Sequence, residues 1–111
     1  MKKNYNKLVR DNIPEIIKAD NCRPNIRKLG KQEYLKELMK KLKEEAEELI
    51  NAKDNEKELA KEISDVYEVI DAIIDYYNLD KDKISEFKKE RKEKRGGFEK
   101  RIFLESIVND E

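Results

Sequence analysis

Residues 35–50 are LKELMKKLKEEAEELI, and residues 59–77 are LAKEISDVYEVIDAIIDYY. In both stretches the apolar residues recur at steps of three and four, which is the period of one face of an α-helix. Neither stretch contains Gly or Pro, the two residues that most weaken a helix. We therefore predict long amphipathic helices over about 30–52 and 55–77. Their apolar faces consist of Leu35, Leu38, Met39, Leu42, Ala46, Leu49 and Ile50, and of Leu59, Ile63, Val66, Ile70, Ile73 and Tyr77.

The connection between these helices is only a few residues long, around 53–55, which favours an antiparallel helical hairpin. Each helix carries an acidic pair at three-residue spacing: Glu45 with Glu48, and Glu62 with Asp65. On an ideal helix the first member of each pair lies roughly 60° from the centre of its apolar face, and the second roughly 120°. In an antiparallel hairpin, residues whose positions share a constant sum lie opposite each other. Glu48 should therefore face Glu62, and Glu45 should face Asp65.

Such a cluster of carboxylates has a cost, because two unit charges about 4 Å apart repel by roughly 4 kcal/mol at an effective dielectric constant near 20. A cation would remove it, and oxygen ligands without His or thiolate select Mg²⁺, Mn²⁺ or Ca²⁺ over zinc or copper. Mg²⁺ also binds substrate phosphates, which points to phosphate ester or anhydride chemistry. The alternative is a solvated helix face, since a Glu-rich helix places acidic pairs at this spacing by chance. The matched offsets and heights of the two pairs favour a metal site.

The pattern EExxE followed by ExxD resembles the MazG-like all-α nucleoside triphosphate pyrophosphohydrolases, which include phosphoribosyl-ATP pyrophosphohydrolase. Here it is Glu44-Glu45-Ala46-Glu47-Glu48, thirteen further residues, and Glu62-Ile63-Ser64-Asp65. KLVRDNIPEII at residues 7–17 and KRGGF at residues 94–98 are similar to the small single-domain branch of that family.

The resemblance implies cleavage of a nucleoside triphosphate between its α- and β-phosphates, in a homodimer or homotetramer. It also implies that Mg²⁺, or Mn²⁺ in its place, is held by Glu45, Glu48, Glu62 and Asp65. The predicted fold class is accordingly all-α, an antiparallel helical hairpin bundle completed by oligomerisation, in one domain over residues 1–111.

Two further groups of residues are candidates for a role in the reaction. A glutamate of the first cluster, Glu44, Glu45 or Glu48, would take the proton of an attacking water, although Glu44 points away from the apolar face on an ideal helix. A third helix should begin after Asp80 or Asp82 and end in a basic run. Lys92 and Arg95 of that run are candidates for binding triphosphate oxygens, with a solvated helix end as the alternative.

Near the start of the chain, Arg10 and Asp11 could reach the active site, although a salt bridge between elements is the simpler role. A short helix should follow them, with Asp11 or Asn12 as its N-cap and Pro14 in its first turn.

The composition narrows the classes of function. The chain has no His, which excludes Ser-His-Asp and Cys-His catalysis and His-ligated zinc. Its formal net charge is zero, so no general nucleic-acid or membrane surface is expected. No long apolar run or signal-peptide core is present, and the lone Cys22 agrees with a reducing compartment, so we expect a cytoplasmic protein. Hydrophobic content of 37% against 47% charged residues is low for 111 residues, which favours an oligomeric interface.

Three functions are thus open. The first is a Mg²⁺-dependent pyrophosphohydrolase that removes unwanted nucleotides from the pool. The second keeps this chemistry but acts on phosphoribosyl-ATP in histidine synthesis. The third is a non-catalytic helical interaction module whose acidic clusters are only solvated surface. The sequence carries no code for the base or sugar of the substrate.

Overall fold

The structure of the protein, a computed structural model, describes residues 2–109 and confirms the all-α prediction. Within that range the chain forms four helices and no strand: α1 (Ile13–Ala19), α2 (Lys31–Asn51), α3 (Glu56–Tyr77) and α4 (Lys81–Arg95). None of these helices is long and apolar enough to cross a membrane. The chain divides into two compact units, one ending at Leu79 and the other beginning at Asp80. The bundle, its oligomerisation and the single domain over residues 1–111 stay predictions.

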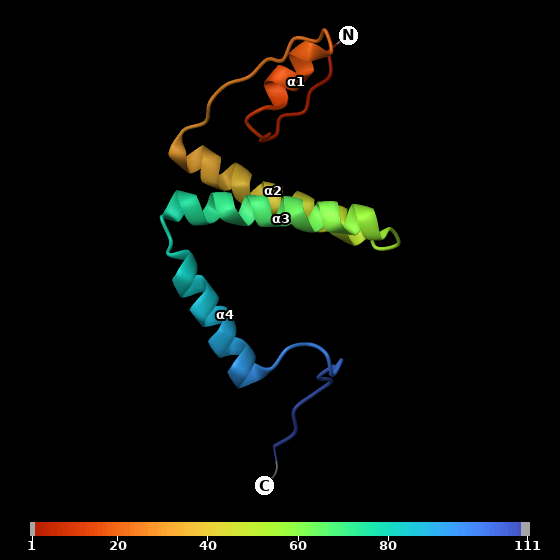
Figure 1. Ribbon diagram of the computed structural model, residues 1–111, viewed down its shortest axis with the longest axis vertical. Helices are drawn as coiled ribbons and strands as arrows, with labels where there is room; N and C mark the ends of the chain where they lie inside the picture. Colours follow the sequence, from red (N-terminus) through yellow and green to blue (C-terminus); the bar gives the residue numbers. More distant parts are fainter. Residues whose placement is uncertain (1, 110–111) are drawn as a thin grey trace. The chain divides into compact units, whose positions relative to one another are not determined.

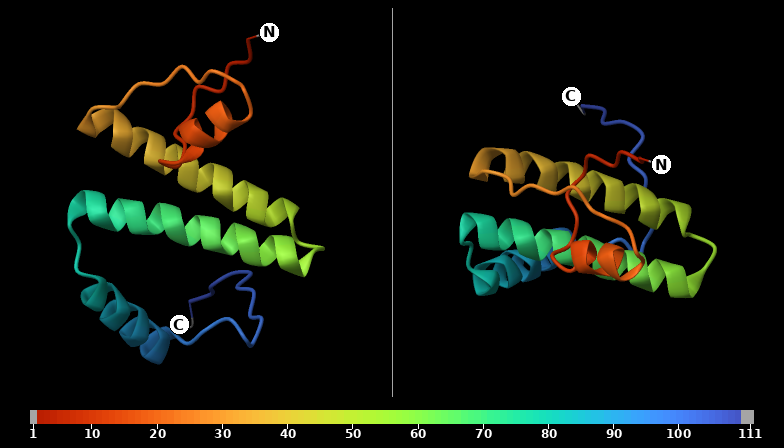
Figure 2. Two further views of the ribbon diagram at one scale, coloured as in Figure 1. Left: turned by 45° about the horizontal axis from the view of Figure 1, so that its top comes forward. Right: turned by 90° about the horizontal axis from the view of Figure 1, so that it is seen from above.

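The two long helices begin and end close to the predicted positions. The amide of Ala52 closes α2 by donating to the carbonyls of Glu48 and Leu49. Asn55 caps α3, its side chain accepting a hydrogen bond of 3.1 Å from the amide of Glu58. Asn78 ends α3 in the left-handed conformation, at φ 54° and ψ 45°. The connection is therefore one tight turn, and the helices run antiparallel side by side (Figures 1 and 2).

The buried seam between α2 and α3 differs from the predicted one. Leu38 and Val69 are the buried apolar residues of the described chain, at 3% and 8% exposure, and Glu45 is buried beside them at 7%. Glu45 thus lies within the seam, not roughly 60° from its centre as the apolar pattern predicted. The predicted core residues Met39, Ile50, Ile63, Ile70 and Tyr77 are 39–66% exposed.

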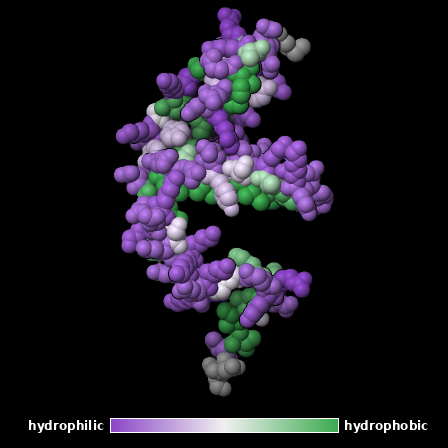
Figure 3. Space-filling model, in the orientation of Figure 1, coloured by the Kyte–Doolittle hydropathy of each residue, from purple (hydrophilic) through white to green (hydrophobic). Residues whose placement is uncertain are grey.

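The reason is that two helices in contact cover only a narrow strip of each other. Each apolar face here is wider than that strip, and both helices turn their acidic edge toward it. The remaining apolar residues of the two faces stay exposed. Figure 3 shows apolar surface along the edge of the α2–α3 pair.

The first unit also holds the N-terminal segment and α1. Asn12 precedes α1, but its side chain makes no capping hydrogen bond, and Pro14 occupies the first turn as predicted. The salt bridge of 2.6 Å between Arg10 Nη2 and Asp65 Oδ1 ties this segment to α3, across 55 positions of sequence. Arg10 therefore forms a salt bridge between elements, which is one of the two roles considered for it. Its partner in that salt bridge, Asp65, is one of the candidate metal ligands.

The second unit consists of α4 and residues 96–109. Asp80 caps α4 by accepting from the amides of Asp82 and Lys83, at 2.9 and 3.4 Å. Gly96 ends the helix at φ 82°, a backbone conformation that favours glycine. After the helix, Phe98 is 96% exposed. Five further large apolar side chains are each more than 70% exposed, namely Ile102, Phe103, Leu104, Ile107 and Val108.

Candidate metal centre

Three carboxylates converge on the α2–α3 seam. Glu45 and Glu48, one turn apart on α2, and Glu62 on α3 each place one carboxylate oxygen within 4.8 Å of the other two. The i, i+3 spacing puts the first two on one side of α2, and the antiparallel packing brings Glu62 opposite them. The structure therefore brings Glu48 and Glu62 together, as the constant-sum rule predicts.

Two oxygens of this cluster have no hydrogen-bond partner among the described residues. They are Oε2 of Glu45 and Oε2 of Glu62, and both are shielded from solvent. A buried polar atom without a partner costs about 1–3 kcal/mol, and more when it is charged. A bound cation or a proton would satisfy both oxygens.

The surroundings raise the pKa of two of the three carboxyls above the ordinary value of 4.5. For Glu45 burial is the largest cause, followed by the charge of Glu48 and by the hydrogen bond to Glu48 that a protonated Glu45 would make, while Lys41 acts in the opposite direction. For Glu62 burial is again first, followed by the charge of Glu48 and by the hydrogen bond to Glu48 that a protonated Glu62 would make. Asp65 raises the pKa of both groups by its charge. Without a cation, the cluster therefore favours binding a proton.

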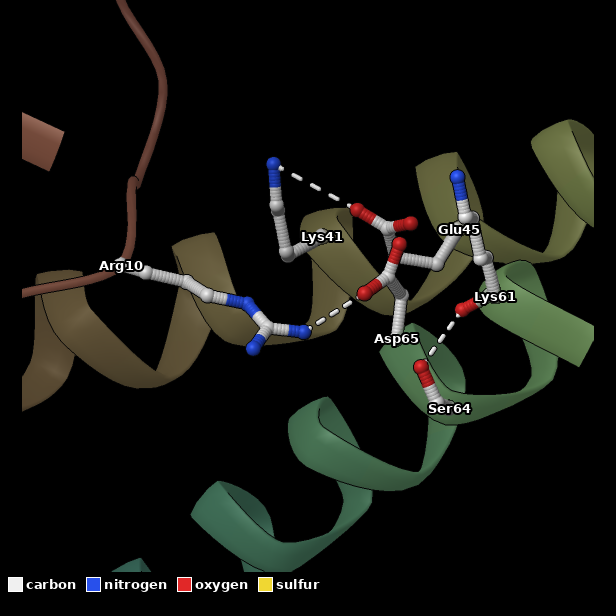
Figure 4. Close-up of polar contacts among 6 residues, drawn as sticks. All are labelled: Arg10, Lys41, Glu45, Lys61, Ser64 and Asp65. Carbon is white, nitrogen blue, oxygen red and sulfur yellow. Dashed lines mark hydrogen bonds and ion pairs between the residues drawn. The ribbon is translucent and has the colours of Figure 1, made fainter. Parts of the chain in front are cut away.

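Asp65 lies beside the cluster, and its carboxylate contacts the guanidinium of Arg10 (Figure 4). Its Oδ1 accepts the hydrogen bond of 2.6 Å from Arg10, while Glu45 approaches from the opposite helix. Lys41 places its Nζ 3.6 Å from Oε1 of Glu45 and 3.5 Å from Oε2 of Glu44. The candidate centre thus combines four carboxylates with the side chains of Arg10 and Lys41, whose positive charges partly neutralise them.

The structure places the other candidate residues as follows. Glu44 is half-buried and paired with Lys41, outside the group of three converging carboxylates. Lys92 and Arg95 lie in the last turn of α4, in the second unit, and both are exposed. Their binding of triphosphate oxygens stays a prediction.

Sequence reasoning missed Lys41, whose spacing to Glu44 and Glu45 is i, i+3 and i, i+4. That spacing is the signal that would have identified it, because residues three and four apart are neighbours on a helix.

The ligand set fits a hard divalent cation. All donors are carboxylate oxygens, two of them buried and unpartnered, and no described imidazole or thiolate lies among them. Mg²⁺ and Mn²⁺ accept such ligands and leave coordination positions to water or phosphate.

The cluster also borders solvent-accessible space. A hollow of about 420 Å³ reaches it from the α2–α3 turn, and its polar lining residues are Glu48, Asn51, Asp54, Asn55, Glu58 and Glu62.

Comparisons of the chain with protein-family models, with curated proteins and with solved structures find no match.

Proposed function

We propose that the protein is a Mg²⁺-dependent nucleoside triphosphate pyrophosphohydrolase that releases pyrophosphate and leaves the nucleoside monophosphate. The observation that carries the proposal is the buried carboxylate of Glu45 in the acidic cluster, whose Oε2 has no hydrogen-bond partner among the described residues. A buried carboxylate at position 45 adds no stability to the α2–α3 hairpin by itself, whereas a metal site requires a carboxylate there. The motif resemblance supplies the α–β cleavage and the nucleotide substrate.

In this proposal Glu45, Glu48, Glu62 and Asp65 hold the metal. When bound, the metal polarises phosphoryl oxygens and lowers the pKa of a coordinated water. The chain's own contribution is to fix the carboxylates on two packed helices, where little rearrangement is needed. A glutamate of the α2 cluster accepts the proton of the attacking water, and Glu44 remains a candidate because Lys41 holds it beside Glu45.

The test is pyrophosphate release from a panel of canonical, deoxy and modified triphosphates with Mg²⁺. Glu45→Gln should abolish turnover and leave the helical circular dichroism spectrum unchanged. Glu47→Gln is the matched control, because Glu47 is exposed on the same helix and outside the cluster. Undiminished Mg²⁺-dependent release by Glu45→Gln would refute the assignment.

Two alternatives make different predictions in the same experiment. Phosphoribosyl-ATP belongs in the panel, and activity confined to it would place the enzyme in histidine synthesis. The interaction module is favoured by one observation, the large apolar side chains left exposed on α2, α3 and the C-terminal segment. A module would show no turnover and no change of melting temperature with millimolar Mg²⁺ or Mn²⁺.

We also propose that the enzyme is a homodimer or homotetramer. Only Leu38 and Val69 among the described apolar residues are buried, whereas Ile63, Ile70 and Tyr67 of α3 are 39%, 39% and 65% exposed. Exposed apolar surface of this kind is typical of a protein interface. Light scattering coupled to size-exclusion chromatography gives the number of subunits, and a monomer at micromolar concentration would contradict the proposal.

A further inference from the structure

A second hollow beside the acidic cluster has a mixed lining. It measures about 280 Å³, and its charged lining residues are Lys7, Arg10, Lys41, Glu45 and Asp65. Three of these side chains are cations and two are carboxylates, and they come from the N-terminal segment, α2 and α3. Sites that enclose drug-sized ligands measure roughly 300–1,000 Å³, so this hollow suits a phosphoryl group better than a whole nucleotide.

The carboxylate wall of this hollow is the candidate metal centre itself. Glu45 contributes to both, and its side chain is more than nine-tenths buried, with Oε2 unpartnered. A ligand in the hollow would therefore contact the cations on one side and a metal on the carboxylates on the other. A metal-bound di- or triphosphate needs this arrangement, because one divalent ion does not neutralise its charge.

Arg10 is the cation best suited to hold such a ligand. Its single 2.6 Å contact with Asp65 uses one of the five N–H donors of a guanidinium, and 57% of its side chain is exposed. The guanidinium fork binds two phosphate oxygens at once, which a Lys ammonium does not. The same contact holds the Asp65 carboxylate, which is not among the three converging groups.

We propose that Arg10 exchanges partners: it pairs with Asp65 in the free protein and with a phosphate of the metal-bound substrate in the complex, where Asp65 completes the metal site. Lys7 and Lys41 line the same hollow and add positive charge. This inference rests on the proposed function, and it places the phosphate-binding cations on the first unit, in addition to the predicted Lys92 and Arg95.

The exchange predicts opposite effects of one substitution on two ligands. Arg10→Ala should weaken inorganic pyrophosphate binding in the presence of Mn²⁺ by about 10–100-fold, the usual cost of a lost charge-assisted pair. The same variant should bind Mn²⁺ alone as tightly as the wild type or up to about fivefold more tightly, because Asp65 is released from an exposed ion pair. If the Arg10–Asp65 salt bridge were only structural, Arg10→Ala would weaken the binding of both pyrophosphate and Mn²⁺ alone.

The experiment is isothermal titration calorimetry on the full chain with Mn²⁺ alone, and with pyrophosphate at saturating Mn²⁺. Arg27→Ala is the matched control, since Arg27 forms a comparable surface pair with Glu33, at 2.6 Å, outside the hollow. Arg10→Lys keeps the charge without the fork and should lie between wild type and Arg10→Ala. It also serves as the second variant if Arg10→Ala fails to fold.

Each outcome decides between the two proposals. Unchanged pyrophosphate binding by both Arg10 variants in an active enzyme would overturn the exchange and leave the proposed function standing. Arg10-dependent pyrophosphate binding in a protein that releases no pyrophosphate from any triphosphate would support the anion site and overturn the proposed function. Weaker binding of both pyrophosphate and Mn²⁺ alone would assign Arg10 a structural role and overturn the exchange.

Discussion

Glu45→Gln should be more stable than the wild type without metal and less stable than the wild type with metal. Two unit charges 4.8 Å apart, the limit found within the cluster, repel by about 3 kcal/mol at an effective dielectric constant of 20. Water around the exposed Glu48 screens this repulsion, so we expect about 1–2 kcal/mol of relief when Glu45 loses its charge. The glutamine amide can also donate to Glu48. At about 4–8 °C per kcal/mol, Glu45→Gln in EDTA should melt about 4–16 °C above the wild type.

Metal should produce the opposite order. At a hundredfold excess of Mn²⁺ over its dissociation constant, the wild type gains about 2.7 kcal/mol by mass action. Glu45→Gln lacks a buried ligand and should gain little. Differential scanning fluorimetry in EDTA and in 5 mM MnCl₂ measures both differences, with Glu47→Gln as a control expected to follow the wild type. If Glu45→Gln melts below the wild type in both conditions, Glu45 stabilises the fold directly, and the argument from crowded charges is wrong.

Three further predictions follow from the same geometry. The pKa values of Glu45 and Glu62 are raised above 4.5 in the folded protein, so folding favours the protonated form of both carboxyls. The stability that these two carboxyls contribute is therefore present at low pH and is lost as the pH rises through their folded pKa. The excess melting temperature of Glu45→Gln over the metal-free wild type should therefore shrink between pH 8 and pH 5, and a constant difference would contradict the assigned shift. Lys41→Met removes the cation 3.6 Å from Glu45 and should tighten Mn²⁺ binding several-fold at pH 8, because a positive charge beside the metal ligands is lost. The gain should be smaller at pH 6, where the proton also competes more strongly for Glu45, and weaker binding than the wild type at pH 8, measured by calorimetry, would contradict this argument. Ile63→Lys or Ile70→Lys, on the exposed part of α3, should lower the mass measured by light scattering without changing the circular dichroism spectrum, and an unchanged mass would place the interface elsewhere.

The sequence was sufficient to predict the helices and which carboxylates lie opposite each other. Helical periodicity without Gly or Pro predicts α2 and α3, and the short turn at 52–55 makes them antiparallel. With that connection, the facing of Glu48 and Glu62 follows from counting alone. These features depend on local spacing, which a single sequence contains in full.

The rotation of the helices and the place of Arg10 could not be predicted in this way. The apolar pattern treats Met39 and Leu38 as equal members of one face, but the partner helix covers only part of that face and selects Leu38. The Arg10–Asp65 pair depends on the path of the N-terminal segment, since its members are 55 positions apart. Neither feature is a property of local periodicity.

The rotation of α2 and α3 links the candidate metal centre to the exposed apolar surface. Turning both helices toward their acidic edge moves Glu45 and Glu62 into the seam, and the same turn moves Ile63 and Ile70 outward. A lone hairpin is destabilised twice, once by unpartnered buried oxygens and once by uncovered apolar side chains. A cation satisfies the oxygens, and a second copy of the chain would cover the apolar side chains. Metal binding and assembly should therefore each raise the stability of the hairpin, because both act on the same rotation of the same two helices.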